Sequence, residues 1–196
     1  MAKELSKIIH NWVPDDSKVI DFGCGDGSLL KDLMQSKNVL GYGVEINDHK
    51  IQNCIANGVP VIKQDIDKGF AEFESSNFDL SIMARSIQCL KNPATALNGM
   101  LKLSKRCVVT LPNLGYWRCR LNLISGKMPI TPELPSSWYE TENIHLCTIK
   151  DFEKLCADES IKIKDKVFLN KNGDRSKLVS IKPNLMAVEG VYLLEK

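Results

Sequence analysis

The stretch KVIDFGCGDGSLL, residues 18–30, decides the fold of this chain. Its first five residues form a short apolar run that is typical of a buried strand, and glycines follow at 23, 25 and 27. From Ser28 onward the leucines fall on one face of a helix. The stretch therefore predicts a strand, a tight glycine turn and a helix, which together open an α/β sheet.

The chain on both sides continues this alternation. We expect a helix up to about Val13, further helices at 28–35, 48–57 and 93–103, and strands at 38–45, 59–64, 78–83 and 106–111. Short apolar strands that alternate with helices imply a mostly parallel sheet with helices on both faces. Ligands of such sheets bind beyond the carboxyl ends of the strands, so the loops that follow them should surround one site.

The pattern changes at Pro112. Residues 112–151 show little periodicity but hold two of the three tryptophans, which argues for a functional segment rather than a disordered one. We then expect a helix that begins near Thr148 and ends near Cys156, and two last strands at 161–169 and 184–194. The whole chain, 1–196, is predicted to form a single domain.

Composition excludes several classes of protein. The formal net charge of +2 gives no reason to expect nucleic acid or a membrane surface as a partner. The seven cysteines are odd in number and form no CxxC pair, so we expect reduced thiols in the cytoplasm and no metal site. No run of 18 apolar residues is present to span a membrane.

The glycine loop can be compared with the two ligands that such loops commonly hold. A dinucleotide loop needs GxGxxG, but here Ser28 stands where the last glycine should be. Asp21 and Asp26 flank the loop, and a carboxylate close to a pyrophosphate would be repulsive by about 1–4 kcal/mol. S-adenosylmethionine (SAM) instead carries a cationic amino group that suits Asp21. An NAD-type domain is therefore disfavoured.

Acids at the ends of the next two predicted strands support the same ligand. Glu45 lies about 20 residues past the loop, where a carboxylate can accept both hydroxyls of a ribose. Asp65 follows the third strand and could accept a hydrogen bond from an adenine amino group, while Ile66 packs on the ring. Three acids at three successive strand ends are more specific than any one of them.

These motifs resemble the class I SAM-dependent methyltransferases. The blocks GYGVE (41–45), LPNLGYWR (111–118), GKMP (126–129) and PSSWYETENIHLCT (135–148) make the chain similar to one family in particular, the methionine biosynthesis protein MetW family. The resemblance runs from about residue 17 to 170, and its most specific part follows residue 111. Beyond about residue 170 it is loose.

The resemblance implies a Rossmann-like class I methyltransferase fold, in which the last two of seven strands form an antiparallel hairpin at one edge. It implies SAM or S-adenosylhomocysteine as cofactor and a MetX-type homoserine O-acyltransferase as partner. The residues expected to contact the cofactor are Asp21, Gly23, Cys24, Gly25, Gly27, Glu45, Ile46, Asp65 and Ile66.

Two functions remain open at this point. The chain is either a partner or regulatory subunit of the acyltransferase, or an active SAM-dependent methyltransferase on an unidentified small molecule. Candidates for contact with an acceptor or partner come from the loop after the fourth strand and from the segment after Leu111: Arg85, Asn113, Tyr116, Trp117, Arg118, Trp138, Tyr139 and His145. No acid–histidine pair or amide-methylation motif assigns a catalytic residue, so the sequence indicates a cofactor more clearly than a reaction.

Overall fold

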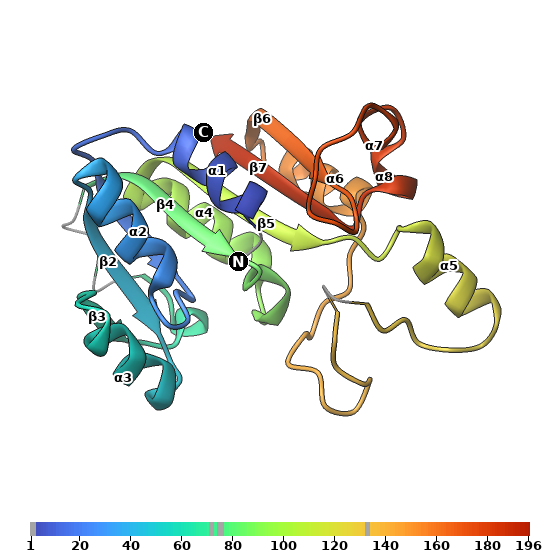
Figure 1. Cartoon of the computed structure of the whole chain (residues 1–196), viewed down its shortest axis with the longest axis horizontal. Helices are drawn as coiled ribbons and strands as arrows, with labels where there is room; N and C mark the ends of the chain where they lie inside the picture. The colour runs from blue at the N-terminus through green and yellow to red at the C-terminus, as the bar shows by residue number, and fades with distance from the viewer. Residues whose placement is uncertain (1–2, 71–72, 74–76, 132–133) are drawn as a thin grey trace.

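A computed structural model describes residues 3–70, 73, 77–131 and 134–196 (Figure 1). Its centre is one seven-stranded sheet in the order β3-β2-β1-β4-β5-β7-β6. The strands are β1 (Lys18–Phe22), β2 (Leu40–Glu45), β3 (Val61–Lys63), β4 (Phe78–Ala84), β5 (Ser104–Pro112), β6 (Lys162–Leu169) and β7 (Glu189–Glu195). The first five are parallel, and β7 runs antiparallel to both β5 and β6. The predicted mostly parallel sheet with an antiparallel pair at one edge is confirmed.

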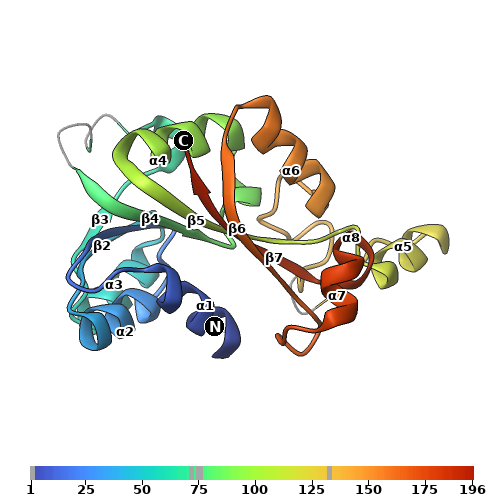
Figure 2. The same cartoon turned by 90° about the horizontal axis from the view of Figure 1, so that it is seen from above.

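Helices cover both faces of the sheet, as predicted (Figure 2). One face carries α1 (Lys3–Trp12), α2 (Ser28–Lys37) and α3 (Asp48–Ala56), and the other carries α4 (Pro93–Leu103) and α6 (Ile149–Asp158). Each face has its own apolar core because successive strand residues point to opposite sides. In β1, for example, Val19 packs into one core and Ile20 into the other. In the described part of the chain, no helix has the length and apolar character needed to cross a membrane.

Two helix starts show how local sequence fixes these elements. Gly27 precedes α2 with a φ of +73°, a left-handed conformation that favours glycine. At α6 the Thr148 side chain accepts from the backbone of Asp151, and the Asp151 side chain accepts from the backbone of Thr148. This reciprocal capping box satisfies two amides that the helix cannot pair internally, and it confirms the predicted start near Thr148.

The last predicted strand, 184–194, begins too early. Residues up to Ala187 belong instead to the connection between β6 and β7, which contains the short helices α7 (Lys177–Ile181) and α8 (Pro183–Met186). Pro183 opens α8 because proline at the first helical position loses no hydrogen bond. The Ser176 side chain caps α7 by accepting from Val179 N. The strand therefore starts at Glu189.

The segment 112–151 also departs from the prediction, because it contains the helix α5 (Trp117–Ile124). Tyr116 stands at the cap position and makes no side-chain capping bond. The sequence thus carries none of the start signals from which a helix is usually predicted. The third strand is shorter than expected, since only Val61–Lys63 pairs with β2.

Candidate functional site

The glycine loop follows β1 and is held against the next strand. The amides of Gly23 and Cys24 both donate to the carbonyl of Val44 in β2, at 2.8 and 3.1 Å. Gly23 and Gly25 have φ values of +78° and +61°, and residues with a side chain rarely adopt such positive values. A Cβ on Gly23 would also lie 2.4 Å from the Ser86 hydroxyl, whereas a Cβ on Gly25 would meet nothing within 4 Å. At Gly25 the backbone therefore borders open space, where a ligand could approach it closely.

A cavity of about 410 Å³ lies at the carboxyl ends of β1 to β4, where the fold predicts a ligand. It brings together six of the predicted site residues: Gly23, Glu45, Ile46, Asp65, Ile66 and Arg85. Four more residues of its wall lie in the loops and the segment that the sequence predicts around the site: Gln64, Ser86, Glu142 and Ile144. The rest of the wall was missed by sequence reasoning and consists of Lys50, Asp67, Cys89, Leu90 and Lys91. Most of these carry no motif of their own and reach the cavity only through the fold.

The carboxylate of Glu45 is held by three backbone hydrogen bonds. One of its carboxylate oxygens accepts from Gly25 N at 3.0 Å, and the other accepts from Ile46 N at 2.9 Å and Asn47 N at 3.0 Å. The side chain is buried, yet it forms part of the cavity wall. Each carboxylate oxygen has two lone pairs, so Ile46 and Asn47 occupy both on Oε1, while Gly25 occupies one on Oε2. The backbone amides therefore fix the carboxylate and leave one site, on Oε2, to accept a hydroxyl group from a ligand.

Asp21 lies in β1 behind the loop, and its side chain is 2 % exposed. Among the described residues, its Oδ1 finds no hydrogen-bond partner. Burial, followed by the charge of Glu45, raises the pKa of the Asp21 carboxyl to about 7. A cationic group bound nearby would stabilise the ionised carboxylate. This unsatisfied acid therefore fits the amino group of SAM.

The other predicted cofactor residues differ in what their side chains offer. Ile46 and Ile66 are apolar parts of the cavity wall. Asp65 accepts from Asp67 N at 3.0 Å and so caps the short 3-10 helix η1 (Ile66–Lys68). Gly27 begins α2. Contact between these residues and a cofactor stays a prediction.

Cys24 points away from the cavity. Its sulfur lies 3.6 Å from that of Cys54, which donates to the Gly25 carbonyl behind the loop. Burial raises the pKa of both thiols, so both stay protonated at neutral pH. Any contact of Cys24 with a cofactor would therefore come from its backbone. In the part of the chain that the structure describes, no cluster of His, Cys, Asp or Glu could hold a metal ion.

Arg85 occupies an unusual position at the end of β4. Its φ of +57° is left-handed although it is not glycine. Its guanidinium forms two hydrogen bonds with Glu189, at 2.6 and 2.7 Å, and its side chain lines the cavity. Glu189 is buried and was missed by sequence reasoning. The sequence feature that could have identified Glu189 is its position as an isolated acid within the apolar run around Val188 and Val191.

Asn113 is buried and ties the start of the irregular segment to its end. Its side-chain oxygen accepts from Gly115 N and Ile149 N, at 2.9 and 3.2 Å, and its amide donates to Ala187 O at 2.7 Å. This network accounts for the side chain without an acceptor or partner molecule. The residue closes the segment into a loop that returns to α6.

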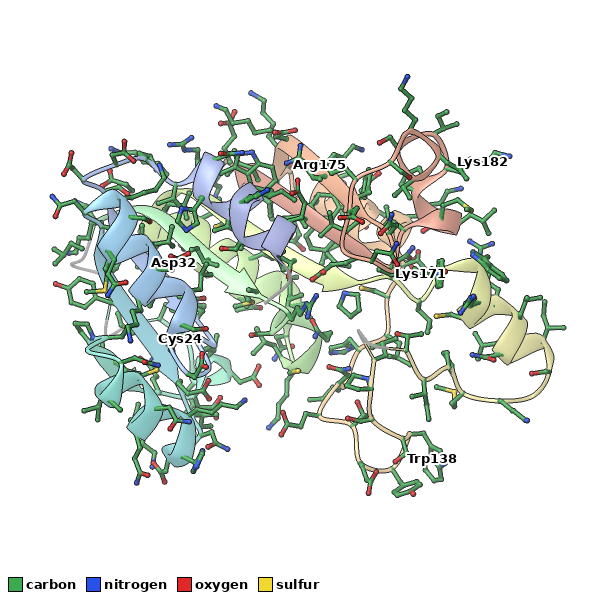
Figure 3. The ribbon with its side chains drawn as sticks, in the orientation of Figure 1. Cys24, Asp32, Trp138, Lys171, Arg175 and Lys182 are labelled. Atoms are coloured by element: carbon green, nitrogen blue, oxygen red, sulfur yellow. The ribbon has the colours of Figure 1, made fainter. Side chains whose placement is uncertain are left out.

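The remaining candidates fall into three places. Tyr116, Trp117 and Arg118 lie at the start of α5, away from the cavity wall. Trp138 is 73 % exposed and stacks edge-to-face with Tyr139 at a centroid distance of 5.6 Å. Figure 3 shows Trp138 on the loop that projects from the body. His145 returns to the cavity region, because its backbone amide and that of Ile144 both donate to Gln88 O at 2.9 Å.

Comparison with known sequences identifies related proteins. The family described as "Methionine biosynthesis protein MetW" matches residues 3–194. The "Bifunctional methionine biosynthesis protein MetXA/MetW" of Rhodopirellula baltica is 28 % identical over 166 residues, which cover 80 % of this chain. Those residues cover 27 % of the relative, so the chain spans about a quarter of that protein.

Comparison with solved structures supports the fold. A chain in the complex between the Haloferax volcanii Trm112 methyltransferase activator and the putative methyltransferase aligns with a TM-score of 0.69 at 11 % identity, covering 99 % of this chain and 89 % of that one. A SAM-dependent methyltransferase from Thermotoga maritima, a possible histamine N-methyltransferase, aligns with a TM-score of 0.67 at 15 % identity, covering 100 % and 89 %. These similarities show the Rossmann-like methyltransferase fold.

Proposed function

This chain belongs to the MetW family of methionine biosynthesis proteins, and we propose that it binds SAM and acts with a MetX-type homoserine O-acyltransferase. In this proposal the chain is a partner or regulatory subunit, and SAM occupies the cavity at the carboxyl ends of β1 to β4. The observation that supports SAM as the ligand is a pair of buried acids beside the glycine loop, Asp21 in β1 and Glu45 at the end of β2.

The two acids match two different parts of SAM. Glu45 is fixed by three backbone amides at the cavity wall, and its Oε2 keeps one lone pair that can accept a ribose hydroxyl. Asp21 carries an unsatisfied buried oxygen, for which the amino group of SAM would supply both a donor and a positive charge. A dinucleotide would instead bring its pyrophosphate to the glycine loop, where Asp21 and Asp26 would repel it. S-adenosylhomocysteine shares the ribose and the amino group, so it should bind the same site.

The bifunctional relative supports the proposed partnership with a MetX-type acyltransferase. Its name joins a MetXA unit and a MetW unit in one polypeptide. A covalent link holds two units at a high effective concentration, which is useful when they act on each other. In the present chain, exposed apolar residues of the segment after Leu111 provide a surface for such a contact: Leu121, Leu123, Ile124, Met128, Ile130, Trp138, Tyr139, Ile144 and Leu146.

The segment from Trp138 to Leu146 suggests how SAM would influence the partner. Glu142 and Ile144 line the cavity, while Trp138 and Tyr139 are exposed a few residues earlier in the same loop. A ligand that favours one arrangement of this loop would therefore bias the exposed surface. Because SAM is made from methionine, it could report the end product to the pathway. Coupling of about 1–3 kcal/mol is sufficient for such feedback.

The proposal is tested first by binding. Isothermal titration calorimetry with SAM should give saturable binding to the wild-type chain, alone or in complex with the acyltransferase. Glu45→Gln and Asp21→Asn should each weaken it by about 1 kcal/mol or more, as expected for a hydrogen bond to a charged group. Asp32→Asn replaces an exposed acid on α2, so it is the matched control and should leave affinity unchanged. Equal affinity in all four proteins would overturn the site.

The second test measures the partner. The acyltransferase from the same organism is assayed with homoserine while this chain and then SAM are titrated. We expect the chain to change the acyltransferase rate and SAM to modify that change. If no complex forms and the rate is unaffected, the partnership is wrong. If a small molecule gains a methyl group while SAM is consumed, the chain is an active methyltransferase instead.

A further inference from the structure

The helix α5 lies at the far end of the molecule from β3 and is not packed onto the sheet (Figure 1). Ile124 is 82 % exposed and Leu121 is 54 % exposed, while Cys119 is buried. An eight-residue helix is too short to be stable by itself in water. Its exposed apolar side chains are therefore available to pack against another molecule.

A second cavity, of about 500 Å³, lies beside this helix and is separate from the SAM cavity. We call it the α5 groove and define it by six of its lining residues: Trp117, Arg118, Leu121, Ile130, Lys171 and Val188. Beneath the groove, Tyr116, Cys119 and Val188 pack together in a small buried apolar cluster. Figure 3 places Lys171 near the chain that leads into α5.

Among the described residues that line the α5 groove, the charged side chains are both cations. Arg118 lies over the Trp117 ring at 5.2 Å from its centroid, and Lys171 lines the same cavity. No acidic side chain among the described residues forms a salt bridge with either of them. Residues 113–131 contain three cations and no acid, although the net charge of the whole chain is only +2. The groove is therefore complementary to a carboxylate with an apolar neighbour.

We propose that the α5 groove docks an acidic, apolar segment of the acyltransferase. A carboxylate of that segment lies between Arg118 and Lys171, and an apolar side chain packs on Trp117 and Leu121. This inference rests on the proposed function, since it names the surface that the partner uses. Tryptophan, tyrosine and arginine are the residues most often found at the energetic centre of protein interfaces.

The size of the exposed surface favours a protein over a small anion. The exposed apolar side chains continue along α5 to Leu123 and Ile124, which do not line the groove that holds the two cations. Apolar residues that are contiguous on a protein surface commonly mark a protein interface. The mixture of cations and apolar side chains then selects the partner, because an uncharged surface would leave Arg118 and Lys171 desolvated without compensation.

The test compares charge reversals in the full-length chain. Arg118→Glu, Lys171→Glu and the double variant are mixed with the purified acyltransferase, and the dissociation constant is measured by biolayer interferometry. Lys102→Glu, an exposed lysine on α4, is the control. We expect each groove variant to weaken the complex by about tenfold or more and the control to leave it unchanged. Thermal unfolding and SAM binding of all variants should match the wild type, which separates docking from folding.

Three outcomes would overturn the inference in different ways. If the wild-type chain binds the acyltransferase and the groove variants bind equally well, the groove is wrong while the proposed function stands. If the wild-type chain forms no complex, the proposed partnership fails and the groove fails with it. If light scattering shows that the chain alone dimerises and that Arg118→Glu abolishes the dimer, the groove binds a second copy of this chain instead.

Discussion

The guanidinium of Arg85 forms two hydrogen bonds with the carboxylate of Glu189, from Nε to Oε1 at 2.6 Å and from Nη2 to Oε2 at 2.7 Å. This ion pair joins the end of β4 to the start of β7, two strands that β5 separates in the sheet. Arg85 lines the cavity proposed for SAM, and Glu189 follows Val188 of the α5 groove. The pair therefore lies between the two candidate sites.

Removing the charge of Glu189 should destabilise the protein. Glu189→Gln keeps the shape of the side chain but removes the negative charge that pairs with the Arg85 guanidinium. Breaking a buried pair costs about 3–5 kcal/mol, but the Arg85 side chain is 41 % exposed, so we expect a loss of about 1–3 kcal/mol in the free energy of unfolding. Urea unfolding measures this change. Lys154→Gln breaks an exposed helical pair and should cost less than about 0.5 kcal/mol; equal effects would contradict the structural role of Arg85–Glu189.

The two glycines of the loop should respond differently to alanine. At Gly25 only the φ of +61° opposes a side chain, so Gly25→Ala should cost about 1–2 kcal/mol in unfolding free energy. At Gly23 the new Cβ would also overlap Ser86, and the cost should rise to roughly 2–4 kcal/mol. The double variant Gly23→Ala/Ser86→Gly should recover part of that difference. Urea unfolding measures all three, and equal losses for both single variants would refute this account of the loop.

The parts of the site that sequence could predict are those in which local pattern and function coincide. The loop glycines follow a strand and precede a helix, and Glu45 ends the next strand, so the alternation of elements was enough to bring them together. Glu189 could not be paired with Arg85 in this way, because they are 104 positions apart and meet only through the antiparallel placement of β7.

The elements that sequence missed lack local signals. Helix α5 has neither a capping side chain nor a continuous apolar face, and its only buried residue is Cys119. Helix α8 is four residues long, and its Pro183 is as common in turns as in helix starts. The contacts of Gln88 O with Ile144 N and His145 N belong to the backbone, so no choice of side chain reports them.

Binding of SAM should protect the loop that returns to the cavity. The amides of Ile144 and His145 share the Gln88 carbonyl, and Ile144 lines the cavity, so a bound ligand should reduce the opening of these hydrogen bonds. Hydrogen–deuterium exchange should therefore slow several-fold at 142–146 when SAM is added. The amides of Ser125 and Gly126 at the end of α5 serve as the internal reference. Unchanged exchange at 142–146 under saturating SAM would show that the bound cofactor does not stabilise this loop.

The pH dependence of stability should report Asp21. Its pKa is raised to about 7 in the folded chain, against 3.8 when exposed. Between these values the folded state holds a proton that the unfolded state has lost, so stability falls as pH rises, by up to about 1.4 kcal/mol for each pH unit. The stabilising effect of the bound proton is complete below pH 4 and is lost as pH passes 7.

Asp21→Asn removes this titration. The difference in unfolding free energy between Asp21→Asn and wild type should therefore grow in favour of the variant from pH 5 to pH 7.5, as measured by urea unfolding without ligand. Asp79→Asn is the contrasting control, because hydrogen bonding by Lys18 N lowers the pKa of Asp79, whose titration is complete below this window. Its difference from wild type should stay constant. A cationic ligand favours ionised Asp21, so SAM affinity should rise over the same interval in wild type but not in Asp21→Asn. Parallel profiles for Asp21→Asn and wild type would rule out Asp21 as the titrating group.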